Sequence, residues 1–237
     1  MKNLDVIIIS WAKDNELYKT TNKGLKSLLS SESTDTIKIN PIIVESNKKI
    51  NWDFYPNTKT IYTDKPFGYH RYLNLGILSS NSEYICLSNN DLIYEKRWAS
   101  AIINEMEKDK DLMSACPFCP QTLPVSMRNS GNHYGYIVRE HLGGWCIFQR
   151  RDIYNKIGSL DEDVEFWYSD NIYADELKLR NIKHALITTS VVNHHEKNLG
   201  KTGEIAIDGK TRLHYTRDQF ELYTKKVNEL NNKLMNS

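Results

Sequence analysis

A short polar run ending in a carboxylate follows directly after an apolar segment of this sequence. Residues 84–87 read Tyr-Ile-Cys-Leu, and Ser88, Asn89, Asn90 and Asp91 come next. A carboxylate with carboxamides beside it supplies the oxygen ligands that Mg²⁺ or Mn²⁺ prefers, and such an ion keeps positions open for phosphate oxygens. Asp91 can equally be a turn or helix-cap residue. Its role therefore depends on partners from other segments.

Polar segments also end other predicted strands. Residues 10–14 follow the apolar run 4–9, residues 45–47 end the segment 37–47, and His194 follows an apolar run in the second half. In an open α/β sheet, ligands bind beyond the carboxyl ends of the strands. If the strand order brings these segments together, Asp91 and His194 can hold one Mn²⁺ beside a diphosphate. The ordinary alternative for a lone histidine is a solvated loop position.

The elements that must position these residues alternate along the first 110 residues. The run 4–9 suits a strand that is buried on both faces of a parallel sheet, and Asp14 can cap a leucine-bearing helix after it. This alternation predicts an α/β fold, with a doubly wound, mostly parallel sheet flanked by helices. Further strands are predicted at 37–47, 59–62 and 83–87, and helices begin at Gly68 and Trp98.

The second half is less regular. Residues 112–140 hold three prolines and no clean period, which predicts loops. Residues 212–234 have apolar positions at helical spacing, which predicts a long amphipathic helix. That helix packs on its own domain or, as an alternative, forms a homodimer. Strands are also predicted at 145–148 and 185–192, and helices at 151–157 and 170–180.

Composition excludes several classes of protein. The chain has 237 residues, 40% of them hydrophobic, which fits one large α/β domain. The formal net charge of +1 does not indicate binding to nucleic acid or to an anionic membrane through overall charge. No apolar run approaches the roughly 20 residues that span a bilayer. The start of the chain is typical of a first strand rather than a signal peptide, so we expect a cytoplasmic protein without a transmembrane segment.

The four cysteines include one Cys-x-x-Cys pair, Cys116 and Cys119. A structural zinc site needs four ligands, and no second such pair completes it. His133 and His141 are the residues that could serve as the other two. We favour the simpler interpretation, in which both thiols are packed in the interior.

The order of these motifs resembles that of the GT-A glycosyltransferases, especially the family 2 type, from about residue 5 to about residue 200. VIIISWAKD resembles the opening strand and nucleotide-contacting loop, and IIVESN the second strand with its acidic residue. GYHRYLNLGILSSNSEYICLSNNDLIYEKRW resembles the helix, strand and metal-motif segment. LGGWCIFQRRDIYNKIGSLDEDVEFWYSDNIYADELKLRNIK and VVNHH resemble the acceptor-side segment and the strand that precedes the metal-binding histidine.

The resemblance implies a GT-A (Rossmann-like) domain over residues 1–210 and a C-terminal helix over 211–237. Residues 1–110 would be the nucleotide-sugar-binding half, here called the donor half. Residues 111–210 would be the acceptor-side half, here called the acceptor half. The implied activity is an inverting, metal-dependent transfer of a sugar from a nucleotide-diphosphate donor to an acceptor hydroxyl. The acceptor stays open between a saccharide, a protein, a small molecule and a modified DNA base.

The resemblance also implies roles for individual residues. Asp91 and His194 would bind Mn²⁺ or Mg²⁺, with Asn89 at the position of the first carboxylate of the family's DXD motif. Asp170 would be the catalytic base and would take the proton of the acceptor hydroxyl. Ser169 stands where the family often has a glutamate. The implied donor-binding residues are Ser10, Trp11, Asp14, Glu45, Arg71, Asn90, Gly144 and Trp145, and the acceptor-side residues are Asp161, Glu162 and Trp167.

Two alternatives remain on the sequence alone. Asn89 and Ser169 replace carboxylates, so a catalytically degenerate module that only binds sugar nucleotides is one. A nucleotidyltransferase is the other, although SWAKDN lacks the glycines typical of the signature loop in that class. A Rossmann dehydrogenase is disfavoured because no GxGxxG motif follows any predicted strand.

Overall fold

The computed structural model describes residues 1–12, 14–47, 49, 55–194 and 212–235. Its centre is a nine-stranded mixed sheet with the strand order β3-β2-β1-β4-β8-β6-β9-β5, and β7 pairs with β9 off this path. The strands are β1 (Lys2–Ser10), β2 (Ile37–Glu45), β3 (Lys59–Tyr62), β4 (Tyr84–Ser88), β5 (Leu92–Tyr94), β6 (Leu112–Phe118), β7 (Asn132–Tyr134), β8 (Cys146–Arg150) and β9 (Lys183–His194).

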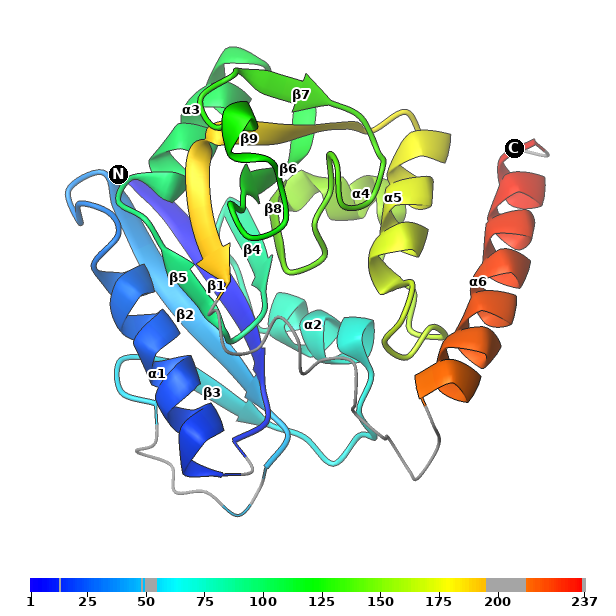
Figure 1. The fold of residues 1–237 in the computed structure, drawn as a ribbon, viewed down its shortest axis with the longest axis horizontal. Helices are drawn as coiled ribbons and strands as arrows, with labels where there is room; N and C mark the ends of the chain where they lie inside the picture. Colours follow the sequence, from blue (N-terminus) through cyan, green and yellow to red (C-terminus); the bar gives the residue numbers. More distant parts are fainter. Residues whose placement is uncertain (13, 48, 50–54, 195–211, 236–237) are drawn as a thin grey trace.

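Six α-helices accompany this sheet in the described part of the chain (Figure 1). They cover both of its faces, as expected for a doubly wound α/β fold. The helices are α1 (Asn15–Leu29), α2 (Tyr69–Leu78), α3 (Trp98–Lys108), α4 (Tyr154–Ile157), α5 (Ser169–Leu179) and α6 (Arg212–Met235).

The donor half contains the parallel part of the sheet. β3, β2, β1 and β4 run parallel to one another. Alternate residues of β1 face opposite sides, so Val6 packs with α1 and α3 while Ile7 packs with α2 and α5. Both side chains are fully buried. The near-continuous apolar run of the first strand therefore reflects burial on two faces, as the sequence predicted.

The acceptor half breaks the parallel pattern. β8 is antiparallel to both β4 and β6, and β9 is parallel to β6. The prediction of loops throughout 112–140 is wrong for β6 and β7. β6 is buried along its whole length, and its polar Ser114 is satisfied by His184 of β9 and Tyr173 of α5. A strand with a serine, a cysteine and a proline gives little local signal, and these partners lie far along the chain.

Helix α2 approaches the sheet very closely. A Cβ atom on Gly76 would lie 2.2 Å from Cγ2 of Ile7 in β1, so no side chain fits there. Asn74, two residues earlier, donates to Leu160 O over 2.9 Å and accepts from Leu160 N over 3.1 Å. The Asn-x-Gly pattern therefore serves two purposes, since it docks α2 on the sheet and fastens the loop before α5.

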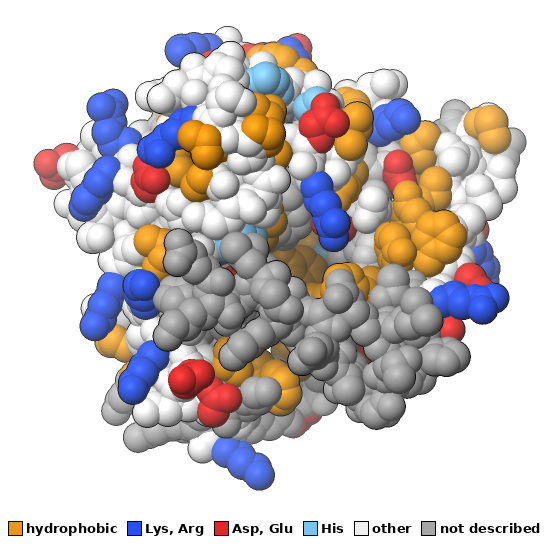
Figure 2. All heavy atoms as spheres, in the orientation of Figure 1, with side chains coloured by type: hydrophobic (Ala, Val, Ile, Leu, Met, Phe, Trp, Pro, Cys, Tyr) orange, Lys and Arg blue, Asp and Glu red, His pale blue; other side chains and the backbone are white. Residues whose placement is uncertain are grey.

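The C-terminal helix α6 lies beside α5 on the side of the molecule opposite α1 (Figure 1). Figure 2 shows hydrophobic side chains between these two helices, where Tyr168 stacks on Tyr223 and Phe220 packs against both. The prediction that this helix packs on its own domain is confirmed for the described residues. None of the described helices is long and apolar enough to cross a bilayer.

Candidate functional site

The polar segments that the sequence singled out do converge on one edge of the sheet. The parallel register places Ser10 of β1 beside Glu45 of β2, and Ile8 beside Ser88 of β4. Glu45, Ser10 and Ser88 end the neighbouring strands β2, β1 and β4. The carboxyl ends of parallel strands meet at one edge, which is where ligands bind in open α/β sheets.

At the end of β2, Glu45 is fully buried, and both of its carboxylate oxygens accept hydrogen bonds. Its Oε1 accepts from the backbone N–H of Ala12 over 3.1 Å and of Asn47 over 2.7 Å. Its Oε2 accepts from the Tyr55 hydroxyl over 2.8 Å, and that hydroxyl lies 2.9 Å from Ser10 Oγ. Glu45 and Ser10, both expected at the donor, thus hold together the loops that follow β1 and β2.

Of the other residues at this edge that were predicted to bind the sugar donor, two form hydrogen bonds within the protein and one is exposed to solvent. Asp14 caps α1 by accepting from Leu17 N over 2.9 Å, which confirms the capping prediction. Trp11 is 52% exposed at the end of β1. Asn90 donates to Thr21 of α1 over 2.9 Å. Their roles toward a donor stay predictions.

Helix α1 also lies close to the β4–β5 turn. A Cβ atom on Gly24 would lie 2.8 Å from Leu92 O and 3.3 Å from Asn90 O. This glycine lets α1 lie against the turn that carries Asn89 and Asp91. The sequence gives no sign of this role, because a glycine within a helical pattern has no specific meaning unless the segment that it contacts is known.

Asp91 differs from the other carboxylates near this edge. Its Oδ1 is buried and has no hydrogen-bond partner. A buried carboxylate oxygen without a partner lowers the stability of a folded protein, so such a group is a candidate for binding a ligand or an ion. Asn89 lies beside it, and its backbone N–H donates to Trp145 O over 2.9 Å.

The pairing of β5 with β9 brings His194 to the same place. Leu92, the residue after Asp91, is the antiparallel partner of His194. The imidazole packs edge-on against Trp145 with ring centroids 5.2 Å apart. Its Nδ1 lies 3.5 Å from Cys119 Sγ, and this contact helps to lower the pKa of the thiol although burial opposes the shift. The structure therefore places Asn89, Asp91, Trp145 and His194 together.

The zinc-site alternative is wrong for the described residues. Among them, no three His, Cys, Asp or Glu side chains form a group that could hold a metal. Cys116 contacts the backbone of Gly143, Cys119 contacts His194, and His133 lies 2.7 Å from Ser130 Oγ. All four cysteines are free and buried, so the packed-thiol interpretation is confirmed.

Asp170 stands in the first turn of α5 and faces Gly144. A Cβ atom on Gly144 would lie 2.7 Å from Asp170 Cβ and 3.0 Å from its Oδ2. Burial raises the pKa of Asp170, while backbone N–H groups, including those of Asn171 and Gly144, and the charge of Arg139 oppose the shift. A carboxylate with a raised pKa is a stronger base, which suits proton abstraction from a hydroxyl.

Tyr69, the first residue of α2, connects the two sides of this arrangement. Its hydroxyl lies 2.6 Å from Gly144 O and 3.0 Å from Asn89 Oδ1. Burial and the nearby charges of Asp170 and Asp91 raise its pKa. Tyr69 was not among the residues predicted from the sequence, since only the folded chain brings residues 69, 89 and 144 together.

Two further predicted residues are engaged with each other. Arg71, expected at a phosphate, donates through Nε to Glu162 Oε2 over 3.3 Å and through Nη2 to Glu162 O over 3.3 Å. Asp161 O lies 2.8 Å from His70 Nδ1, and Trp167 packs against Phe166 with ring centroids 5.1 Å apart. In this structure Arg71 and Glu162 therefore join α2 to the loop before α5.

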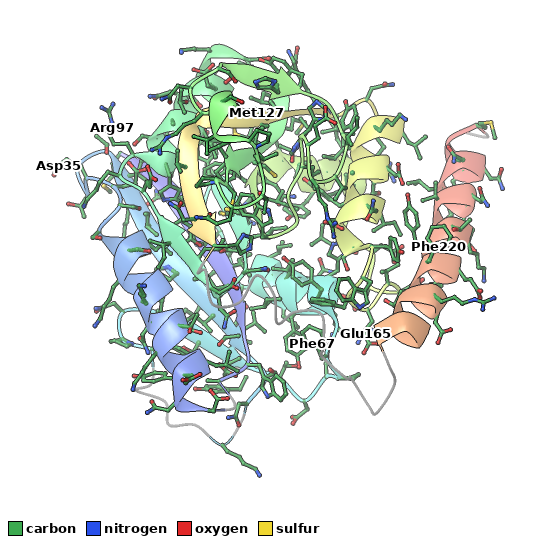
Figure 3. All side chains as sticks on the ribbon, in the orientation of Figure 1. Asp35, Phe67, Arg97, Met127, Glu165 and Phe220 are labelled. Carbon is green, nitrogen blue, oxygen red and sulfur yellow. The ribbon has the colours of Figure 1, made fainter. Side chains whose placement is uncertain are left out.

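That loop also contacts the C-terminal helix. Glu165, labelled in Figure 3, lies between α2 and α6, and its carbonyl accepts from Tyr69 N over 2.6 Å. Gln219 Oε1 of α6 accepts from Glu165 N over 2.8 Å and from Phe166 N over 3.2 Å. The segment that leads into Asp170 is therefore held from both sides.

A cavity of about 370 Å³ lies between α5, α6 and the loop before α5. Its lining is charged and includes Asp163, Glu176 and Lys226. Asp91, Asp170 and His194 do not line it, but the predicted acceptor-side residues Asp161 and Glu162 do.

A divalent cation fits the residues at the β4 edge. Asp91 offers a buried carboxylate oxygen without a partner, His194 offers an imidazole, and Asn89 offers an amide oxygen. Oxygen and imidazole ligands suit Mn²⁺, and two or three protein ligands leave positions for a diphosphate.

The chain belongs to glycosyl transferase family 2, whose family model matches residues 6–160. It is therefore a glycosyltransferase with a GT-A fold. This membership argues against the nucleotidyltransferase alternative. No curated protein sequence matches the chain significantly.

Solved structures share this fold at low sequence identity. The crystal structure of GalNAc-T7 with UDP, GalNAc and Mn²⁺ aligns with a TM-score of 0.66 and 10% identity, over 82% of this chain and 43% of that one. S. aureus TarS 1–349 aligns with a TM-score of 0.65 and 12% identity, over 95% and 65%. The same protein in complex with UDP aligns with a TM-score of 0.63 and 12% identity, over 81% and 60%. The chain thus spans less than two thirds of each neighbour.

Proposed function

We propose that the protein transfers a sugar from a nucleotide-diphosphate donor to an acceptor hydroxyl, with inversion at the anomeric carbon and with Mn²⁺ or Mg²⁺ bound. The observation that carries this proposal is the buried, unpartnered Oδ1 of Asp91 at the ligand-binding edge of the sheet. The Tyr69 hydroxyl lies 3.0 Å from Asn89 Oδ1, two residues before Asp91, and 2.6 Å from the carbonyl of Gly144, which packs against Asp170. A metal-binding carboxylate near a basic carboxylate is what such a transfer requires.

Asp91, His194 and Asn89 would hold the cation. When bound, a divalent ion stabilises the negative charge that develops on the leaving diphosphate. The presence of Mn²⁺ and UDP in the GalNAc-T7 structure, and of UDP in the TarS structure, supports the choice of ligands. A UDP-sugar is accordingly the first donor to test.

Asp170 would act as the base. Its raised pKa favours accepting the proton of the acceptor hydroxyl as that oxygen attacks the anomeric carbon. Gly144 packs against this carboxylate and leaves no room for a side chain that would displace it. A single displacement with one base inverts the anomeric centre.

The donor would lie along the ends of β1, β2 and β4. Trp11 offers an exposed aromatic surface there, and Trp145 packs beside His194. Ser10, Asp14, Glu45 and Asn90 shape the edge through the hydrogen bonds described above. Arg71 acts through Glu162 on the acceptor-side loop that contains Asp161 and Trp167.

The test uses the purified chain with a panel of UDP-, dTDP- and GDP-sugars, in Mn²⁺ or in EDTA. The readout is release of nucleoside diphosphate, and proton NMR of the product gives the anomeric configuration. We expect metal-dependent release from one donor. Asp170→Asn should lower kcat by about 10²–10⁴-fold, the range for loss of a general base.

Asp175→Asn is the matched control. This carboxylate lies on the same helix but accepts from Tyr223 of α6 over 2.5 Å, so its loss should leave turnover near the wild-type rate. Absence of both release and donor binding would contradict the proposal, and donor binding without release in the presence of any acceptor would favour the degenerate binding module. Retention of configuration would contradict the single-displacement mechanism alone.

A further inference from the structure

The Tyr69 hydroxyl faces two oxygen atoms, and it cannot donate to both. Gly144 O lies 2.6 Å away and Asn89 Oδ1 lies 3.0 Å away. A tyrosine hydroxyl has one hydrogen and accepts through its lone pairs. The shorter contact, to a backbone carbonyl that can only accept, takes this hydrogen. The second contact then brings together two acceptors.

Rotation of the Asn89 amide by 180° resolves this conflict. The rotation exchanges Oδ1 and Nδ2, which have nearly the same size, and makes Nδ2 a donor to the hydroxyl oxygen of Tyr69. The result is a chain of bonds from the Asn89 amide through Tyr69 to Gly144 O. Because Tyr69 is only 7% exposed, water cannot readily replace either bond.

We propose that Tyr69 is a positioning residue that fixes the Asn89 amide with Nδ2 toward its own hydroxyl and leaves Oδ1 free for the cation. The inference rests on the proposed function for what the freed oxygen does. The same hydroxyl holds Gly144, whose other side packs against Asp170. Tyr69 therefore orients one group on the metal side and one on the base side.

This arrangement gives a physical reason for an amide at position 89. A carboxylate there has no hydrogen to donate, so it would compete with Gly144 O for the single hydrogen of Tyr69. An asparagine can donate through Nδ2 while it presents its oxygen to a ligand. Asn89 and Tyr69 are therefore expected to be energetically coupled.

The orientation is tested in the metal-free protein by ¹H–¹⁵N correlation of side-chain amides. Loss of one pair of signals in Asn89→Asp assigns the Asn89 amide. In the wild type we expect one of its protons to exchange slowly with solvent, and in Tyr69→Phe to exchange at least about tenfold faster, since roughly one hydrogen bond is lost. Phenylalanine retains the edge-on packing of Tyr69 against Phe166, so the variant should fold.

Tyr72→Phe is the matched control. It removes a hydroxyl from the same helix, where Tyr72 donates to Lys65 O over 3.1 Å, away from Asn89. The Asn89 signal should be unchanged in this variant. An Asn89 amide that exchanges equally fast in the wild type and in Tyr69→Phe would overturn the proposed orientation.

Mn²⁺ affinity, measured by titration calorimetry, tests the consequence. We expect Tyr69→Phe to weaken binding by about tenfold, and Asn89→Asp to improve binding more in the Tyr69→Phe background than in the wild type. Equal effects of Asn89→Asp in both backgrounds would overturn the coupling. If the proposed function is wrong, the wild type will release no nucleoside diphosphate. The amide exchange result does not depend on that activity and would be unchanged.

Discussion

Two carboxylates at the same edge of the sheet have opposite environments. Glu45, at the end of β2, is fully buried, and both of its oxygens accept hydrogen bonds. Asp91, just beyond the end of β4, has a buried oxygen that accepts none. Both follow apolar strands and both looked like ligand-binding residues in the sequence.

The difference shows how the protein divides its polar groups between structure and ligand. The bonds to Glu45 connect Ala12, Asn47 and Tyr55, which follow β1 and β2. Asp91 has a buried oxygen without a hydrogen-bond partner, which lowers the stability of the free protein. A ligand that binds this oxygen would supply the missing partner. Four experiments test whether the two carboxylates differ in this way.

The largest effect is expected for Asp91→Asn. Activity should fall by about 10²–10³-fold, the cost of removing one group that stabilises developing charge. The free energy of unfolding should stay the same or rise, because no hydrogen bond to Oδ1 is lost. Nucleoside diphosphate release and urea denaturation of the same preparation measure the two quantities. A large loss of stability would show that Asp91 is structural.

Glu45→Ala should have the opposite profile. Three buried donors lose their acceptor, so the free energy of unfolding should fall by about 2–3 kcal/mol. Urea denaturation measures this effect, with Glu45→Gln as the control that retains an acceptor and costs less. If Glu45→Ala instead leaves stability unchanged and raises KM for the donor, its role is to bind the nucleotide rather than to order the loops.

A third carboxylate, Asp5 of β1, extends the comparison to pH. Burial raises its pKa, but hydrogen bonds from Ser82, Asn40 and Asn81 outweigh burial and hold the pKa below its ordinary value. A lowered folded-state pKa means that Asp5 contributes stability above about pH 4 and loses this contribution as the pH falls through the folded-state pKa.

Asp5→Asn should therefore destabilise the protein by about 1–2 kcal/mol at pH 7, and the difference from the wild type should shrink below about pH 4. Chemical denaturation at a series of pH values measures it. A difference that is constant with pH would mean that the charge of Asp5 contributes nothing.

The smallest effect is expected for Asp14. Asp14→Ala removes the cap of α1 and should cost about 1 kcal/mol of stability. Asp14→Asn keeps a capping side chain and should cost less. Since Asn lacks the charge, comparison of KM for the donor in the two variants separates the capping role from the predicted role at the donor. Equal stability of all three proteins would rule out a significant cap.

The sequence predicted the donor half well because its signals are local. Each strand there is a short apolar run, and the polar residues that end the strands follow within one or two positions. The parallel register then brings Ser10 and Glu45 together without further information. The elements of the acceptor half depend on distant partners instead. Ser114 of β6 is satisfied by His184, 70 residues later, which no local pattern can indicate.

The residues of the candidate site were likewise predictable only where the signal was local. Asp91 and His194 were identified from their positions after strands, and β5–β9 pairing brings them to one place. Tyr69 was missed because its partner Gly144 lies 75 residues away. Arg71 was expected at a phosphate, but Glu162, 91 residues away, engages it in this structure. Strand ends can be predicted from the sequence, whereas contacts between segments far apart in the chain cannot.

The contact between Trp145 and His194 has an optical consequence. Trp145 is one of five tryptophans, and its ring lies 5.2 Å from the imidazole, centroid to centroid. Indole emission is sensitive to a neighbouring charge, so its intensity should change when an ion occupies the position beside His194. A Trp145→Phe variant would identify this contribution against the other indoles. The protein thus contains an intrinsic fluorophore at its candidate metal site, and ligand binding there can be followed without a label.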